Sequence, residues 1–346
     1  MTPPNPWLTV PSHSSLVPIN GGQVSLHANI AGPISTSSPL VIIEAGLGDC
    51  STTWIPTVRL LSQHARVFSY DRSGFGQSSP PPEDQALTAA QRVRDLRALL
   101  KATGLKGPYV LVGHSYGGTF VREFLRQAVD KGRQGQGKHG EDDEVVGMVL
   151  VDSMTTTSGL SEPNSMGEIF NAEGDDAYAH VVGLDTNHVY SDEEWEAVKA
   201  GEKANGPVAG REAEHAEKCT NEVSEGMGFW RSEAGEGKEG RKCGFRTQPL
   251  GEHRLSCIFG GAQYDFFKVV ENAEKRSVGS QQARKELREF VEKYAAQEVD
   301  DKRAALDLSR QSRWVEAEGR ARTHNMHYTA PEVIVKEVLW VLGISE

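Results

Sequence analysis

Short apolar runs alternate with amphipathic stretches along most of this chain. The runs are rich in β-branched and aromatic residues, which predicts buried strands, at "LVIIEAG", "ARVFSYD", "YVLV", "VVGMVLVDS" and "RLSCIFGG". Between them, apolar residues recur at helical spacing, as in 88–104, where Thr88 and Gln91 have capping-box spacing and Gly104 closes the helix. This alternation predicts an α/β fold, with a mostly parallel sheet covered by helices on both faces.

The pattern weakens between residues 154 and 250. There the spacing predicts a helix at "SDEEWEAVKAGEKANG", opened by Ser191 and Glu194. A long polar segment between two core strands is typical of a cap over the carboxyl edge of the sheet. After the cap we expect a charged helical stretch at roughly 270–310, a last strand at "SRWVEAEG" and a closing helix started by Pro331.

These expectations divide the chain into four parts. They are an N-terminal arm (1–12), a first part of the core (13–153), a cap insertion (154–250) and a second part of the core (251–346).

The stretch "YVLVGHSYGGTF" places Ser115 between a strand and a helix. So sharp a turn strains the serine backbone and needs neighbours without side chains, which Gly113 and Gly117 supply. The hydroxyl is then exposed, and the following helix points its N-terminus at any negative charge that develops there. The pattern predicts a nucleophile elbow. A plain Gly-Ser turn between two core elements could have the same sequence pattern.

Charge and composition narrow the classes of partner. The formal charge of −11 disfavours nucleic acid and anionic membranes as partners. No apolar run reaches the length of a membrane span, and the first residues, "MTPPNPWLTV", lack the pattern of a signal peptide. We therefore expect a cytoplasmic protein. Four distant cysteines without a CxxC motif favour free thiols, with pairing of Cys219 and Cys243 as the alternative.

Hydrolysis through a serine needs a base, a carboxylate that orients the base, and donors for the oxyanion. Two histidines follow the last predicted strand, in "RTHNMHYTAPE". The histidines could also form a surface pair or an H-x-x-H metal site, but no third ligand stands near them in the sequence.

Further segments, in order along residues 40–346, carry recognisable motifs: "EAGLGDCSTTW", "YDRSGFGQS", "GPYVLVGHSYGG", "GMVLVDS" and "THNMHYTAPEVIVKEV". Through them the chain resembles the α/β-hydrolase superfamily, in particular its generic serine hydrolases. The resemblance implies an α/β-hydrolase fold, Ser115 as nucleophile and His324 as base, with His327 at a less critical position. Thr323 stands where the family usually has glycine.

The resemblance leaves two positions open for the acid. Asp152 ends the strand "VLVD", where some family members place it, and Asp265 follows the next strand, where most do. An aspartate at the first position is common in the family without being catalytic, and Asp265 could instead cap a helix.

The same resemblance implies an oxyanion hole made of two main-chain amides. One belongs to Tyr116, directly after the nucleophile, and the other to Leu47 in "EAGLGDCS". Gly46 would form the turn of that loop, and Gly48 would let the loop pass close to the substrate.

These observations predict a serine hydrolase, without metal or cofactor, that cleaves an ester, lactone or thioester of a small molecule. Two other functions stay open. One is lyase, cyclase or dehydratase chemistry that uses His324 as a base, as in other members of the superfamily. The other is ligand binding with slow turnover, as in certain hormone receptors of this fold.

Overall fold

The computed structural model describes residues 4–35, 38–133, 144–155, 166–169, 177–231 and 242–344. The first three residues of the expected arm lie outside the described residues, as do 156–165, 170–176 and 232–241 of the expected cap. The division into arm, core and cap therefore stays a prediction.

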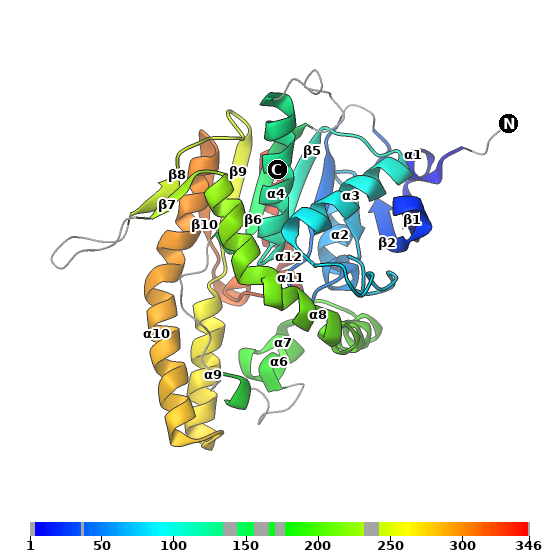
Figure 1. The fold of residues 1–346 in the computed structure, drawn as a ribbon. Helices are drawn as coiled ribbons and strands as arrows, with labels where there is room; N and C mark the ends of the chain where they lie inside the picture. Colours follow the sequence, from blue (N-terminus) through cyan, green and yellow to red (C-terminus); the bar gives the residue numbers. More distant parts are fainter. Residues whose placement is uncertain are drawn as a thin grey trace.

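An eight-stranded sheet runs through the centre of the molecule (Figure 1). Its strands in spatial order are β1 (Ser12–Ile19), β2 (Val24–Ala31), β4 (Val67–Tyr70), β3 (Leu40–Glu44), β5 (Tyr109–His114), β6 (Val145–Val151), β9 (Arg254–Phe259) and β10 (Gln311–Glu316). The β1–β2 and β2–β4 pairs are antiparallel, and the other neighbours are parallel. The predicted mostly parallel sheet is confirmed, and the carboxyl ends of its parallel strands meet at one edge, where ligands bind in such sheets.

Helices and one small hairpin surround this sheet. The helices are α1 (Pro6–Thr9), α2 (Ile55–Leu61), α3 (Ala89–Thr103), α4 (Gly117–Arg133), α6 (Ala177–Val182), α7 (Leu184–Asn187), α8 (Asp192–Gly226), α9 (Ala262–Arg276), α10 (Gln281–Arg303), α11 (Met326–Thr329) and α12 (Pro331–Leu342). The hairpin pairs β7 (Phe229–Arg231) with β8 (Cys243–Phe245).

Alternate residues of the central strand β5 point into two separate cores. Tyr109 and Leu111 pack with the apolar faces of α3 and α4, whereas Val110 and Val112 pack with α2 and α12. The strand is therefore buried on both faces, which is why its sequence reads as a continuous apolar run.

Two helical predictions were too coarse. The helix predicted to end near residue 206 continues through Pro207 to Gly226 as α8, although its capping box is as expected. The single charged stretch predicted at 270–310 is two helices, α9 and α10, which lie side by side (Figure 1). The chain breaks between them because Ser277 and Gly279 have left-handed backbones, with φ of 56° and 67°, and Ser280 then caps the new helix.

The described part of the expected N-terminal arm packs against the core. Residues 6–9 form the short helix α1, and Trp7 is buried in it. The guanidinium of Arg66, just before β4, donates to the carbonyls of Trp7, Val10 and Pro11 at 2.7–3.1 Å. This one side chain ties the N-terminal residues to the sheet.

Two expectations from composition concern membranes and disulfides. Among the described residues, no helix is both long and apolar enough to cross a membrane. The four cysteines are free thiols, so the pairing of Cys219 with Cys243 is not formed.

A buried ion pair joins α8 to the core. Glu212 is fully buried and accepts hydrogen bonds from Arg72 at 3.1 Å and from Arg92 at 2.7 Å. Both arginines are buried as well. Burial opposes the charge on Arg72, but the carboxylates of Glu212 and Glu44 outweigh it and raise its pKa. Removing one member of such a group leaves its partners charged and unpaired in the interior.

We expect Glu212→Gln to lower the free energy of unfolding by about 3 kcal/mol, because the buried Arg92 loses its carboxylate partner and the buried Arg72 loses one of two. Urea denaturation followed by circular dichroism measures the change. Glu214→Gln is the matched control, since Glu214 is exposed on the same helix. Equal stabilities of the two variants would contradict the role given to Glu212.

Candidate active site

Ser115 lies at the turn between β5 and α4, at the carboxyl edge of the sheet. Its φ is 51°, an uncommon left-handed value for a residue with a side chain. The Ser115 amide donates to the Val151 carbonyl at the end of β6, and Gly118 N donates to the Ser115 carbonyl. The backbone around the serine is thus held on both sides, in the strained turn that the sequence predicts.

Close packing explains the glycines around the serine. A Cβ at Gly117 would lie 2.4 Å from the Glu44 carbonyl oxygen, and one at Gly113 would lie 2.8 Å from the Cα of Gly118. At Gly118 it would overlap the Ser153 hydroxyl, at 1.4 Å. Contacts this short cannot be relieved without moving backbone, so the start of α4 packs directly on the ends of β3 and β6.

The structure brings His324 and Asp152 together. Asp152 follows β6, is fully buried and has φ 42°, and His324 lies in the loop between β10 and α11. His324 Nδ1 is 2.6 Å from Asp152 Oδ2. Burial alone would raise the pKa of Asp152, but the neighbouring Lys302 and His324 hold it below its usual value.

Asp265 contacts the backbone of His324 instead of its ring. Its Oδ2 accepts from the His324 amide at 2.8 Å and from the Thr323 hydroxyl at 2.7 Å, and Lys268 Nζ is 3.4 Å from its Oδ1. Thr323, unusual for the family, thus supplies a hydroxyl that Asp265 binds. Of the two candidate acids, Asp152 faces the imidazole and Asp265 fixes the loop that carries it.

The loop after β3 runs close beside the serine. A Cβ on Gly46 would lie 3.4 Å from Ser115 Cβ, and Gly48 has the left-handed φ of 80°. Arg72 braces this loop, since its guanidinium donates to the carbonyls of Ala45 at 2.8 Å and Gly46 at 2.6 Å. The amides of Leu47 and Tyr116 belong to turns and donate to no other main-chain carbonyl in the described parts of the chain.

Helix α8 holds the same loop from the other side. The buried side chain of Asn205 donates to the Gly48 carbonyl at 2.9 Å and accepts from the Gly76 amide at 3.0 Å. Through Glu212 and Arg72 the helix makes a second connection to the loop.

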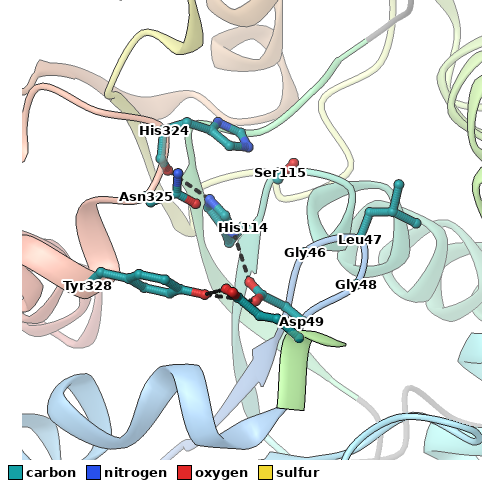
Figure 2. Close-up of a pocket in the computed structure, with 10 residues that line it drawn as sticks. Gly46, Leu47, Gly48, Asp49, His114, Ser115, His324, Asn325 and Tyr328 are labelled. Atoms are coloured by element: carbon teal, nitrogen blue, oxygen red, sulfur yellow. Dashed lines mark hydrogen bonds and ion pairs between the residues drawn. The ribbon is translucent and has the colours of Figure 1, made fainter. Parts of the chain in front are cut away.

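Ser115 and His324 open into a cavity of about 280 Å³ (Figure 2). Its wall is formed by Gly46, Leu47, Gly48, Asp49, His114, Ser115, Glu202, His324, Asn325 and Tyr328. Figure 2 shows His324 and Ser115 at one end of the cavity and Tyr328 and Asp49 at the other. No hydrogen bond joins the Ser115 hydroxyl to the His324 ring within the described residues, a contact that is often long before substrate binds.

His114 lines the cavity, and the buried ring of His327 packs against it. Burial and the neighbouring His327 lower the pKa of His114 to about 4, so its ring is neutral at pH 7. Its Nε2 therefore carries the proton that it donates to the His324 carbonyl at 2.9 Å. His327 is fully buried, stacks on Trp54 and faces Asp49 Oδ2 at 3.4 Å.

Asp49, His114 and His327 form the group of described residues that comes nearest to a metal site, with the possible ligand atoms within 4.8 Å of one another. These residue types bind metals in other proteins. A carboxylate facing an imidazole N–H needs no ion to hold it, however, and Asp49 Oδ1 is 3.3 Å from the Tyr328 hydroxyl. We therefore assign no metal to this cluster.

Several residues around the site escaped the sequence analysis. Asn205 lies at the end of the predicted helix, and Glu212 in the part of α8 that was not predicted. Glu298 and Lys302 lie in a charged helix whose sequence suggests exposure to solvent. No local pattern distinguishes a buried charge from an exposed one on such helices. The partners of Asn205 and Glu212 and the Asp152 partner of Lys302 are more than 100 residues away in the sequence, and the main-chain donors to Glu298 are 35 and 36 residues away.

Comparison with known proteins agrees with this architecture. A family model described as the alpha/beta hydrolase fold matches residues 39–187. An AB hydrolase superfamily protein of Gibberella zeae is 28% identical over 96% of this chain and 97% of its own length. A probable transporter, efuK, of Hormonema carpetanum is also 28% identical, over 99% of this chain; the chain spans only 44% of that protein.

Solved structures share the fold at low sequence identity. A crystal structure of a putative lipase from Acinetobacter baumannii superimposes with a TM-score of 0.59 at 13% identity, covering 98% of this chain and 93% of the lipase. Over residues 39–187 the chain is similar to the alpha/beta hydrolase fold family, and its fold is that of the solved α/β hydrolases.

Proposed function

We propose that this protein is a serine hydrolase that cleaves an ester, lactone or thioester of a small molecule through an acyl-enzyme on Ser115. The observation that carries the proposal is the contact of His324 Nδ1 with Asp152 Oδ2, at 2.6 Å, beside a serine held in a strained turn. Similarity to the alpha/beta hydrolase fold family over residues 39–187 supports a hydrolytic reaction.

The proposal gives each ring nitrogen of His324 a role. Because Nδ1 faces Asp152, Nε2 is the nitrogen left for the Ser115 hydroxyl. In the first half-reaction Ser115 Oγ attacks the carbonyl carbon, and its proton passes to Nε2 and then to the leaving alcohol or thiol. In the second, water gives a proton to Nε2 and attacks the acyl-enzyme, releasing the acid and restoring the serine. Asp152 stabilises the imidazolium that forms in each half-reaction.

The amides of Leu47 and Tyr116 are the proposed oxyanion donors. Both lie on segments held by buried polar contacts, which keeps donors oriented before the charge develops. One such donor contributes about 3 kcal/mol of transition-state stabilisation. Gly46 and Gly48 let the loop approach the substrate closely.

The charge of the cavity limits the substrate. Asp49 and Glu202 line it, and no lysine or arginine does so among the described residues. Burial opposes ionisation of Asp49, but the facing imidazole of His327 helps to lower its pKa below the usual value, so it is charged at pH 7. We propose that the substrate is neutral or cationic near the reacting carbonyl. The free thiols favour the cytoplasm as the compartment.

Labelling with a fluorophosphonate probe tests the assigned roles. We expect Ser115→Ala to abolish labelling and His324→Ala to lower its rate at least 1,000-fold. Asp152→Asn should lower the rate about 10⁴-fold, because the imidazole loses its orienting carboxylate. Asp265→Asn, the matched control, should cost only about tenfold, since Asp265 holds backbone. Intact-protein mass spectrometry measures the label.

Folded wild-type protein that fails to label, or variants in which Asp265→Asn is the more damaging change, would contradict this assignment. Turnover by Ser115→Ala that persists on a substrate found by screening would point to lyase chemistry with His324 as base. Circular dichroism of each variant shows that a lost label is not lost structure.

A set of esters that differ only in the charge of the acyl chain tests the proposed substrate preference. We expect kcat/KM to rank the cationic and neutral esters above the anionic one. Glu202→Gln should narrow the gap between cationic and anionic esters about fivefold, which corresponds to about 1 kcal/mol for one charge near the surface. Glu214→Gln, an exposed change on the same helix, should leave the ranking unaltered. A preference for the anionic ester would contradict the proposed preference for neutral or cationic substrates.

A further inference from the structure

The second oxygen of Asp152 accepts more hydrogen bonds than the one that faces His324. Oδ1 accepts from the amides of Gly260 and Gly261 at 3.0 Å each and from the ammonium of Lys302 at 2.6 Å. The main-chain donors alone would orient the carboxylate. The positive charge of Lys302 opposes the task of Asp152, which is to stabilise a positively charged imidazole.

Lys302 has a second carboxylate as partner. Its ammonium also donates to Glu298 Oε1, one turn earlier on α10. Glu298 is 4% exposed and Lys302 6%. Glu298 in turn accepts from the amides of Ala262 and Gln263 at the start of α9, at 3.1 and 3.2 Å. The lysine is therefore held between two buried carboxylates.

The charges of these groups add up to one negative charge. Burial opposes the charge on Lys302, but the two carboxylates outweigh it and raise its pKa, so it stays protonated at neutral pH. Lys302 cancels the charge of one carboxylate, and the other remains to face His324. Without Glu298, Asp152 and Lys302 would neutralise each other, and the imidazolium would lose much of its electrostatic support.

We propose that Lys302 and Glu298 are positioning residues that act through Asp152 and set the pH range in which His324 works as a base. Glu298 restores the negative charge that Lys302 removes from Asp152. The inference rests on the proposed role of His324. It assigns a chemical task to α10, a helix that supplies no residue to the cavity wall.

Other titratable groups surround the same cluster and must stay unchanged in a test. The His114 ring lies 4.8 Å from the His324 ring, and the Tyr294 hydroxyl donates to Glu298 at 3.2 Å. The remaining described groups that face the cluster are Asp265 and Lys268 on α9, Tyr178 on α6, Asp301 on α10 and His327 on α11. The variants below keep all of them.

Variants that remove one charge each test the proposal, because they should shift the midpoint of the pH–rate profile in opposite directions. Lys302→Gln leaves two uncompensated carboxylates, which favours the imidazolium, so the acid-side midpoint of the pH–rate profile should rise by about one pH unit. Glu298→Gln leaves a neutralised Asp152, so the midpoint should fall by a similar amount. The double variant has one negative charge again and should return to within about 0.3 pH units of the wild type.

Two measurements separate failure of this inference from failure of the proposed function. The rate of fluorophosphonate labelling against pH reports on Ser115 and His324 together. NMR titration of the His324 ring in Ser115→Ala protein needs no turnover, so it gives the midpoint even if the protein is no hydrolase. Glu292→Gln is the control, because Glu292 is exposed on α10 and the variant carries the same charge change.

A purely structural role predicts a different result. Loss of stability in urea with all NMR midpoints within 0.2 pH units of the wild type would overturn the proposal. If Lys302→Gln does not fold, two other results test the proposal. The midpoint should be lower in Glu298→Gln than in the wild type, and it should return to the wild-type value in the double variant. Lys302→Arg keeps the positive charge, so the folded variant should have the same midpoint as the wild type.

Discussion

The close approach of α4 to the ends of β3 and β6 is the constraint on which the site depends. Contact distances leave no space for a Cβ at Gly113, Gly117 or Gly118. Packing this tight places the first turn of the helix directly behind Ser115 and sets the left-handed backbone of that residue. In the proposed mechanism, the helix N-terminus and the amide of Tyr116 stabilise the oxyanion.

Buried polar side chains hold the loops that surround this turn. Arg72 and Asn205 fix the carbonyls of the loop after β3, while His114 and Asp265 fix the backbone on either side of the His324 side chain. Each loop is held by main-chain contacts to side chains from other elements. Orientation is therefore present before substrate binds, which is what electrostatic stabilisation of a transition state requires.

Charge distribution links the helices outside the sheet to the chemistry at its edge. Glu212 on α8 balances two arginines beneath the loop after β3, and Lys302 on α10 contacts Asp152. Burying charged groups is costly unless they are paired, so these contacts require the helices to sit in one arrangement. The surrounding helices contribute to the electrostatics of the site as well as to its shape.

The sequence by itself determined the mostly parallel sheet with alternating strands and helices and the turn that carries the serine, because periodicity and glycine spacing act over a few residues. It also placed His324, but it left Asp152 and Asp265 as alternatives. Only the tertiary structure decided that Asp152 faces the imidazole ring and Asp265 its backbone. It alone revealed the buried charge of Lys302, since burial depends on elements far apart in the chain and leaves no local pattern.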